Sequence, residues 1–505
     1  MIRRTLILGA LVTALTGCAS TSPGPAFKDV AGDVEQRSGH SLSWPRDGRE
    51  EKQVDEAIDR LLQKDLTVDS AVQIALLSNP RLRATFEDLS IGQAELVQAG
   101  LLKNPTFTVG SSGWEQEHIN PNLFMQVEQD FLDIVTMPMR KRVAATELEA
   151  TKLRVGDAVL ALAAEVREAF YQAQAAGQVA ATRTEIASAA ATAVELAERQ
   201  HAAGNLNDLG LANERGLASQ VRLDQARSTT EVTTARERLT RLLGLWGTRA
   251  GYRIAPQLPE LPDAEVSLDK LESVAIERRL DVAAMRREVQ AISYTLSVAH
   301  TTRWTGFLNV TVEAARLRGD RRISFGPSAS IELPIFDQRQ AAMARLEALQ
   351  RQSEQRLRAL SIEVRSEVRE ARARLVTARA VVEEYRRTLV PLREQIVALS
   401  QQQYDAMLLG VYQLLTAKQS EYATYREYVE ALRDYWLARS ALERATGTRL
   451  AQAALPPSTS AVPPAGSALP APGPASPGPG SATPAGSAAP ATPPHVHSPS
   501  PGVSP

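Results

Sequence analysis

Four segments of the chain alternate between apolar and polar residues, and they come in two pairs about 200 residues apart. In the segment 323–336, apolar side chains occupy the odd positions, and serine, glycine or glutamate occupies the even positions as far as Glu332. The segments 123–132 and 306–315 share this period of two, and 105–114 shows it more weakly. This period predicts four β-strands, each with one apolar and one polar face.

Each strand pair is followed by two helical patterns of unusual length. We predict helices at 140–203 and 208–244 in the first half, and at 339–406 and 412–446 in the second half. A helix of about 65 residues is roughly 100 Å long, too long for the core of one globular domain. Such rods must pack side by side, as in coiled coils. Pro391 lies inside one of them and predicts a local kink.

The same order of elements recurs with matching residues. The triplet Glu-Val-Arg at 165–167 returns at 363–365, with the same spacing to the following patterns. We therefore interpret 66–250 and 266–450 as two tandem repeats of helix, two strands and two long helices, joined by the Pro-rich linker 251–265. The pattern at 268–303 predicts one continuous helix before the strands of the second repeat.

The N-terminus has the features of an export signal. A basic start and a short apolar stretch predict a signal peptide over residues 1–17. It ends in Leu15-Thr16-Gly17-Cys18, which resembles the lipoprotein box of bacteria and contains the only cysteine of the chain. The resemblance implies a covalent diacylglycerol and an N-acyl chain on Cys18. Because Ala19 rather than aspartate follows, it also implies sorting to the outer membrane.

Two further segments lack the pattern of a packed core. Residues 18–65 are polar and mixed, with prolines at 23, 25 and 45, and we predict an extended lipidated segment there. The tail 451–505 is rich in proline, alanine, glycine and serine, with 16 prolines in its last 50 residues, and is predicted to be disordered.

An alternating four-stranded sheet with one apolar face has two possible environments. It can pack that face on helices in water, as a small cap on a soluble coiled coil. It can instead turn the face to lipid, where open sheet edges are not tolerated. Four strands are too few to close into a membrane barrel, which needs about eight or more. The second case therefore requires several chains, and three copies would supply twelve strands.

The arrangement over residues 66–450 resembles the TolC-like outer-membrane efflux proteins. Residues 403–417 look like the motif of that family at the periplasmic tip, and 387–393 is similar to members associated with heavy-metal efflux. The resemblance implies a mainly α-helical fold with a β-barrel portion: a homotrimer whose twelve-stranded barrel continues into a long helical tunnel. It also implies two partners, a periplasmic adaptor and an inner-membrane RND-type pump.

The turns between the long helices are the candidate sites for adaptor docking and gating. Some members of the family narrow the tunnel with aspartate rings, but Gln413 and Thr416 stand at those positions here, so an acidic gate is not expected there. Gly204 and Gly410 are expected to allow tight turns. The candidate tip residues are Gly204, Asn205, Leu206, Asn207, Met407, Leu409, Gly410, Val411 and Gln413.

The sequence carries no pattern of a catalytic or cofactor site. His495 and His497 form the one close histidine pair, a weak metal candidate in a Pro-rich tail. The 57 Lys and Arg residues balance 58 Asp and Glu residues, whereas a nucleic-acid-binding protein carries a strongly basic face. We therefore expect no enzyme, no cofactor other than the acyl groups on Cys18, and no nucleic-acid partner.

The resulting hypothesis is a passive conduit that carries small molecules or metal ions across the outer membrane. One alternative is the same channel in type I protein secretion, and the other is a periplasmic coiled-coil scaffold lipoprotein. The sequence does not identify the exported substrate.

Overall fold

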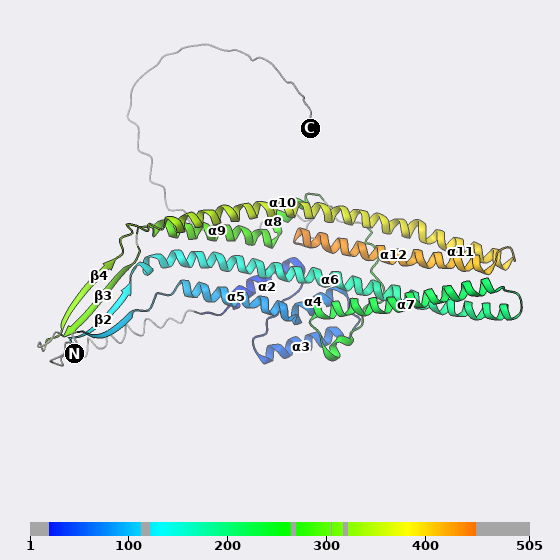
Figure 1. Cartoon of the computed structure of the whole chain (residues 1–505), viewed down its shortest axis with the longest axis horizontal. Coiled ribbons are helices and arrows are strands. Elements are labelled where there is room, and N and C mark those ends of the chain that lie inside the picture. The colour runs from blue at the N-terminus through cyan, green and yellow to red at the C-terminus, as the bar shows by residue number, and fades with distance from the viewer. Residues whose placement is uncertain (1–19, 113–121, 264–268, 305, 317–321, 451–505) are drawn as a thin grey trace, which may run out of the picture. The chain divides into compact units, whose positions relative to one another are not determined.

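The computed structural model has a mainly helical fold with one antiparallel sheet, which confirms that part of the predicted fold class (Figure 1). The predicted signal peptide, Cys18 and the predicted tail with His495 and His497 lie outside the described residues. Among the residues that the structure describes, no helix is both long and apolar enough to span a bilayer. The described residues are 20–112, 122–263, 269–304, 306–316 and 322–450.

The N-terminal segment is helical, and the prediction of an extended chain there was wrong. It forms α2 (Gly24–Ser38) and α3 (Gly48–Leu62). Pro25 stands in the first turn of α2, where a proline removes no helical hydrogen bond. Asp47 caps α3 by accepting from the backbone amides of the first turn. Both helices bury valine or isoleucine pairs spaced by four residues: Val30, Val34, Val54 and Ile58.

In each half a break divides the helical segment that precedes the strands. Asn79 separates α4 (Val68–Ser78) from α5 (Pro80–Ala99), because the residue before a proline disfavours helical geometry. Arg279 separates α8 (Leu271–Arg278) from α9 (Leu280–Thr301) with no proline after it. The single predicted helix at 268–303 is therefore wrong.

The Arg279 break is held by contacts that the sequence pattern does not show. Its guanidinium pairs with Asp281 at 2.8 Å and with Glu367 of a distant helix, and it donates to the carbonyl of Ala445 at 3.3 Å. These contacts hold the backbone of Arg279 in an extended conformation. In a continuous helix its side chain would point in another direction and would not make them.

The long helices run lengthwise beside one another in Figure 1, with α6 contacting the helices of both halves. The predicted second rod at 339–406 is interrupted by a π-helical segment, Tyr385–Leu389, just before Pro391. The long helices are α6 (Leu132–Ala202), α7 (Asp208–Leu243), α10 (Gln340–Glu384), α11 (Val390–Asp405) and α12 (Val411–Thr446).

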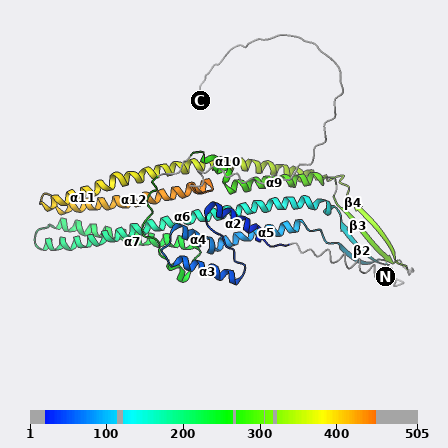
Figure 2. The same ribbon diagram turned by 180° about the vertical axis from the view of Figure 1, so that it is seen from behind.

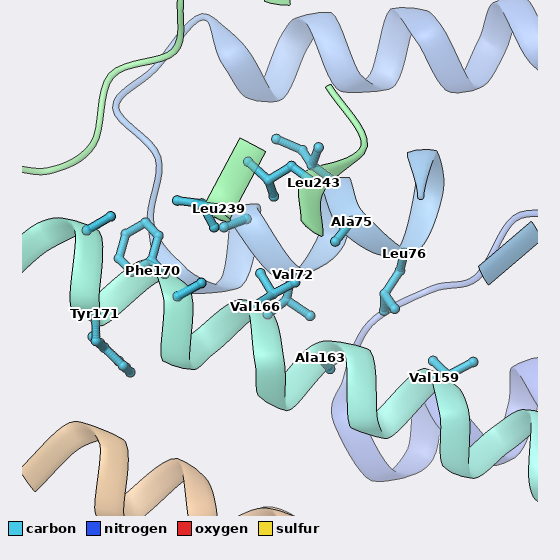
Figure 3. Close-up of a cluster of buried hydrophobic side chains, with 14 of the residues drawn as sticks. Val72, Ala75, Leu76, Val159, Ala163, Val166, Phe170, Tyr171, Leu239 and Leu243 are labelled. Atoms are coloured by element: carbon cyan, nitrogen blue, oxygen red, sulfur yellow. The ribbon is translucent and has the colours of Figure 1, made fainter. Parts of the chain in front are cut away.

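One face of α6 forms much of the buried core. Figure 3 shows Val159, Ala163, Val166 and Phe170, at helical spacings of three and four, against side chains from α4 and α7. Val72 and Ala75 of α4 and Leu239 and Leu243 of α7 have less than 1 % exposure. This packing fixes the first repeat around the middle of α6.

The last helix of each half ends in the same way. Gly244 follows α7 with φ +66°, and Gly447 follows α12 with φ +70°, a region that favours glycine. A Cβ on Gly244 would lie 3.0 Å from the Cα of Asn79, and one on Gly447 would lie 3.2 Å from the Cα of Arg279. Each left-handed glycine thus packs on the residue that breaks the first helical segment of its own half.

Residues 252–263, within the predicted linker, form a strap across four helices. The strap carbonyls accept hydrogen bonds from side chains of each helix in turn. The donors are Arg236 on α7 to Tyr252 O at 2.6 Å, Gln174 on α6 to Gln257 O at 2.7 Å, Trp436 on α12 to Pro259 O at 2.8 Å, and Arg379 on α10 to Pro262 O at 3.1 Å.

The sheet has four antiparallel strands in the order β1-β2-β3-β4. Although β2 and β3 come from different halves of the chain, they pair along their length, with Val127 opposite Val312. The strands are β1 (Thr106–Ser112), β2 (Asn122–Asp130), β3 (Leu308–Arg316) and β4 (Ser324–Ile331).

Candidate functional site

The sheet exposes apolar side chains that a water-soluble protein would bury in its core. Large apolar side chains on one face of every strand are exposed: Phe325 is 75 % exposed, Phe107 63 % and Val312 52 %. The register places these residues side by side, since Val127 lies between Phe107 on β1 and Val312 on β3. Water would drive such a surface into a core, so its exposure marks a face made for an apolar environment. Val109, Leu123, Met125 and Ile331 extend the same face.

The opposite face is mainly polar, and on β1 and β2 it is the better covered of the two. Thr108, Gln126 and Glu128 are only half exposed, and Glu128 accepts a hydrogen bond from the side chain of Asn309 across the strand pair. Gly110 leaves room on this face for the ring of Phe124 on β2, which a Cβ at position 110 would displace. The alternation along each strand therefore separates a lipid-compatible face from a hydrated one.

Exposed apolar side chains continue from the sheet to its junction with the helices. Phe336 is 93 % exposed, just after β4, and Trp304 lies exposed below β3 with the Arg303 guanidinium 4.8 Å from its ring centre. Aromatic residues beside cationic ones are typical of the boundary between hydrocarbon and water. Phe131, Val135, Leu333 and Ile335 are exposed at the same junction.

Both predicted hairpin tips lie at the end of the helices remote from the sheet (Figure 2). In the first tip, Gly204 has φ +73° and the amide of Asn205 donates to Gln200 O at 2.9 Å. Asn207 caps α7 by accepting from the amide of Gly210 at 2.8 Å, and Leu206 O lies 3.0 Å from His201 Nδ1. Local hydrogen bonds thus fix this turn.

The second tip is built differently, and the expectation that Gly410 makes its tight turn was wrong. Met407 takes the left-handed conformation, with φ +60°, whereas Gly410 is extended, with φ −80°. The amide of Gly410 donates to Gln413 Oε1 at 2.7 Å, so here a side chain of the first helical turn accepts from the residue before the helix, the reverse of the bond that Asn207 makes in the first tip. The backbone at Met407 is therefore strained, because the left-handed conformation costs about 1 kcal/mol or more for a residue other than glycine.

The two tips also differ in what they present to a partner. Met407 is 94 % and Leu408 79 % exposed in the second tip, whereas the first tip exposes Asn205 and Asn207 and one apolar side chain, Leu209, at 68 %. Leu409 and Val411 are half-buried. Sequence reasoning missed Leu408, because nothing in an apolar run shows which member points away from the helices.

Gln413 and Thr416, where the sequence predicted no acidic gate, hold neutral side chains that form hydrogen bonds close to their own positions in the chain. Gln413 bonds Gly410, and Thr416 donates to Tyr412 O at 2.8 Å. The nearby acid Asp405 accepts from Gln401 at 2.8 Å, and Glu421 pairs with Lys418. Across the described ranges, no group of three metal-ligating side chains comes together.

Substitutions at the two left-handed residues, Met407 and Gly204, should change the local stability of the two tips in opposite directions. We expect Met407→Gly to stabilise the second tip by about 1 kcal/mol and Gly204→Ala to destabilise the first by about as much, because only the alanine gains a strained Cβ. Hydrogen exchange measures both effects. Peptides over 403–411 should exchange about fivefold more slowly in Met407→Gly, and peptides over 199–208 about fivefold faster in Gly204→Ala. Equal rates in the variants and the parent would contradict the strain assigned to Met407.

Comparison with known proteins identifies the arrangement. The family model described as "Outer membrane efflux protein" matches residues 71–245 and 271–448, once in each half of the chain. The chain belongs to this outer membrane efflux protein family. This confirms the resemblance seen in the sequence, and it means that the chain is an efflux channel of the outer membrane.

Relatives of this efflux protein agree in fold and length. The cobalt-zinc-cadmium resistance protein CzcC of Cupriavidus metallidurans is 22 % identical over 392 residues, which cover 76 % of this chain and 90 % of CzcC. The solved structure of CusC covers 76 % of this chain and 92 % of its own, with TM-score 0.63 and 18 % identity. That of VceC from Vibrio cholerae covers 78 % and 97 %, with TM-score 0.61 and 16 % identity.

Members of the family act as conduits rather than as enzymes. The geometry of this chain suits that role: two chemically different sheet faces at one end, and two turns at the other that differ in polarity.

Proposed function

We propose that three copies of this outer membrane efflux protein close their sheets into one twelve-stranded barrel above a helical tunnel. The observation that carries the proposal is the exposed apolar face of a sheet whose edge strands, β1 and β4, each pair on one side only among the residues that the structure describes. Unpaired edges are not tolerated in hydrocarbon, so neighbouring copies must pair them. The apolar face then meets lipid, and the polar face with Glu128 lines the bore.

We propose that the two halves are tandem repeats, so that the trimer has six hairpin tips. Their different surfaces suit a periplasmic adaptor that contacts both kinds of tip, with Met407 and Leu408 supplying the apolar contacts. An inner-membrane RND-type pump would supply the energy. The relationship to CzcC supports divalent metal ions of the cobalt, zinc and cadmium class as cargo.

Attachment of acyl groups to Cys18 is part of the same proposal. The lipoprotein box supports a diacylglycerol and an N-acyl chain as a second membrane anchor beside the barrel. Cys18→Ala should leave the protein in the outer membrane, because the barrel holds it there. Release of the variant into the soluble periplasmic fraction would instead support the scaffold alternative.

Deletion of the gene tests the function directly. We expect the deletion strain to become more sensitive to cobalt, zinc or cadmium salts, and the wild-type gene to restore resistance. Dyes and antibiotics tested in parallel distinguish a multidrug cargo. Unchanged resistance together with loss of a secreted protein would favour type I secretion, and a purified protein that is monomeric by native mass spectrometry would contradict the barrel.

A further inference from the structure

A cavity of about 600 Å³ lies beside the strap, between the hairpin of α6 and α7 and the hairpin of α11 and α12. The residues of α6 that line it run from Ala173 to Glu185, from the level of the strap towards the tip. The strap forms one end of the cavity, and its Glu260 lies 3.7 Å from Arg386 in the π-helical segment before α11. Pockets of roughly 300–1,000 Å³ typically hold small molecules, so this cavity has the size of a ligand site.

The floor of the cavity is a stripe of small residues on α6. Ala173, Gly177 and Ala181 follow at intervals of four, so they lie on one face of the helix. A Cβ built on Gly177 would meet no heavy atom within 4 Å beyond its own helical turn. The floor is therefore open, and a ligand has room to lie against α6.

Gln174 brings an unused hydrogen-bond acceptor to this cavity. The residue is 4 % exposed, and its Nε2 donates to Ala255 O at 2.9 Å and to Gln257 O at 2.7 Å. Because both carbonyls can only accept, these bonds fix which end of the amide is the nitrogen. Its Oε1 is buried and accepts no hydrogen bond from the part of the chain that the structure describes. A buried acceptor without a donor is unfavourable, so the cavity favours a ligand that carries N–H or O–H groups.

The next glutamine along α6 shows what a satisfied amide looks like here. Gln178 donates through Nε2 to the hydroxyl of Tyr425 at 3.1 Å and accepts through Oε1 from the amide of Leu258 at 3.2 Å. It thereby joins α12 to the strap and sets Tyr425 at the edge of the cavity. The unpaired Oε1 of Gln174 is thus the polar group of this wall that a ligand would complete.

The α12 wall suits a positively charged group. Tyr422 and Tyr425 line it, and the faces of aromatic rings attract cations. Beside the cavity, the ammonium group of Lys418 lies 5.1 Å from the ring centre of Tyr422 and pairs with Glu421. The chain itself therefore shows how a primary ammonium group binds to this wall.

The charges around the cavity favour the same class of ligand. Its charged lining residues are Glu185, Glu394, Glu421, Arg236 and Arg393. Carboxylates thus outnumber guanidinium groups. The guanidinium of Arg236 is already engaged with the strap, because it donates to Tyr252 O at 2.6 Å and lies 4.8 Å from the centre of the Tyr252 ring. An anion would meet the unpaired acceptor and the carboxylates, whereas an ammonium compound would satisfy both.

We propose that this cavity binds a small alkyl diamine or polyamine. One ammonium group donates to Gln174 Oε1, another lies on the wall of Glu421 and Tyr422, and the alkyl chain rests on the floor of Ala173 and Gly177. This ligand site is separate from the path of the exported cargo and goes beyond the proposed function. It joins the strap and helices of both halves through one bound molecule.

Putrescine tests the site in the purified full-length protein. Isothermal titration calorimetry should show saturable binding. 1,4-Butanediol, which has the same length but no charge, should bind about tenfold more weakly, because the tyrosine rings and carboxylates attract a cation. Putrescine should also slow hydrogen exchange of peptides over 171–186 and 418–426 about threefold and leave 199–208 unchanged. Absence of binding at millimolar putrescine, or equal binding of the diol, would overturn the proposal.

Gly177→Leu locates the binding. The leucine side chain extends from the floor into the open space, so it should weaken putrescine binding about tenfold. The variant should fold, because leucine favours a helix more than glycine does. Gly216→Leu on α7 is the matched control: a Cβ there also meets nothing within 4 Å, but the residue does not line the cavity. Binding to Gly177→Leu as tight as to the parent, or equal loss in both variants, would place the ligand elsewhere and reject the site.

Lys418→Met separates this wall from general attraction between charges. Removing the competing ammonium group frees Glu421 and the ring of Tyr422, so putrescine should bind about threefold more tightly. Lys64→Met removes an equal charge from an exposed position after α3 and should leave the affinity unchanged. The same gain in both variants would show only a response to net charge and would contradict the assigned wall. Because no cargo is present in these titrations, their outcome does not depend on what the channel exports.

Discussion

Val127→Arg is expected to abolish assembly in the outer membrane. Val127 lies in the centre of the exposed apolar face, opposite Phe107 on β1 and Val312 on β3. An arginine on the lipid face of a barrel costs about 2–4 kcal/mol near the bilayer centre. Three copies in one barrel would raise the cost to roughly 6–12 kcal/mol. Outer-membrane fractionation and the heat-sensitive migration of the trimer on gels measure the loss.

Gln126→Arg is the matched control, since Gln126 is the adjacent residue of the same strand on the polar face. It pairs with Glu313 across β2 and β3, so an arginine there gains a carboxylate neighbour in a hydrated bore. We expect near-normal assembly. Equal loss for the two variants would show that the faces are not differently solvated, and it would remove the main support for the barrel.

Arg279→Met should cost about 3 kcal/mol of stability, because removing one partner of a buried ion pair leaves the other charge uncompensated. The side chain of Arg279 is 8 % exposed and that of Asp281 23 %, so water replaces the lost contacts poorly. Arg287→Met, on the exposed surface of α9, is the control and should change stability little. Denaturant unfolding of the helical part, followed by circular dichroism in detergent, measures the difference.

The same pair predicts a dependence on pH. Burial acts to raise the pKa of Asp281, but hydrogen bonds from Arg279 and its charge outweigh burial, and the pKa lies below its ordinary value. A lowered pKa stabilises the fold above the unfolded value of about 3.9 and loses that contribution as the pH falls towards the folded value. Below about pH 4 the parent should therefore lose stability more steeply than Arg279→Met. Parallel curves would contradict the assignment.

How much of the fold the sequence predicts depends on how far apart the deciding residues are. Period-two segments and long helical patterns predict a mainly helical protein with an antiparallel sheet, because neighbouring residues alone set which way successive side chains point. The same patterns led to the efflux family. Pro25, by contrast, suggested an extended N-terminus, since a proline within a segment and one in the first turn of a helix look alike locally.

At the helical tips, too, some features follow from the sequence and others only from the folded structure. The places of the two turns follow from the ends of the helical patterns. Their conformations do not, because a short loop can place its left-handed residue at a glycine, as at Gly204, or at a neighbour, as at Met407. Exposure of Leu408 and burial of Ala197 depend on the helices that pack beside them.

By itself, the sequence determined the period of each element, the apolar and polar faces of the strands, and the family. Only the tertiary structure decided that the apolar sheet face stays uncovered, that Arg279 breaks a helix to reach Glu367 and Ala445, and that the linker is a strap ending beside a π-helical turn. The physical reason is that period and facing are properties of adjacent residues, whereas these features depend on side chains that meet only after the chain has folded across more than eighty residues.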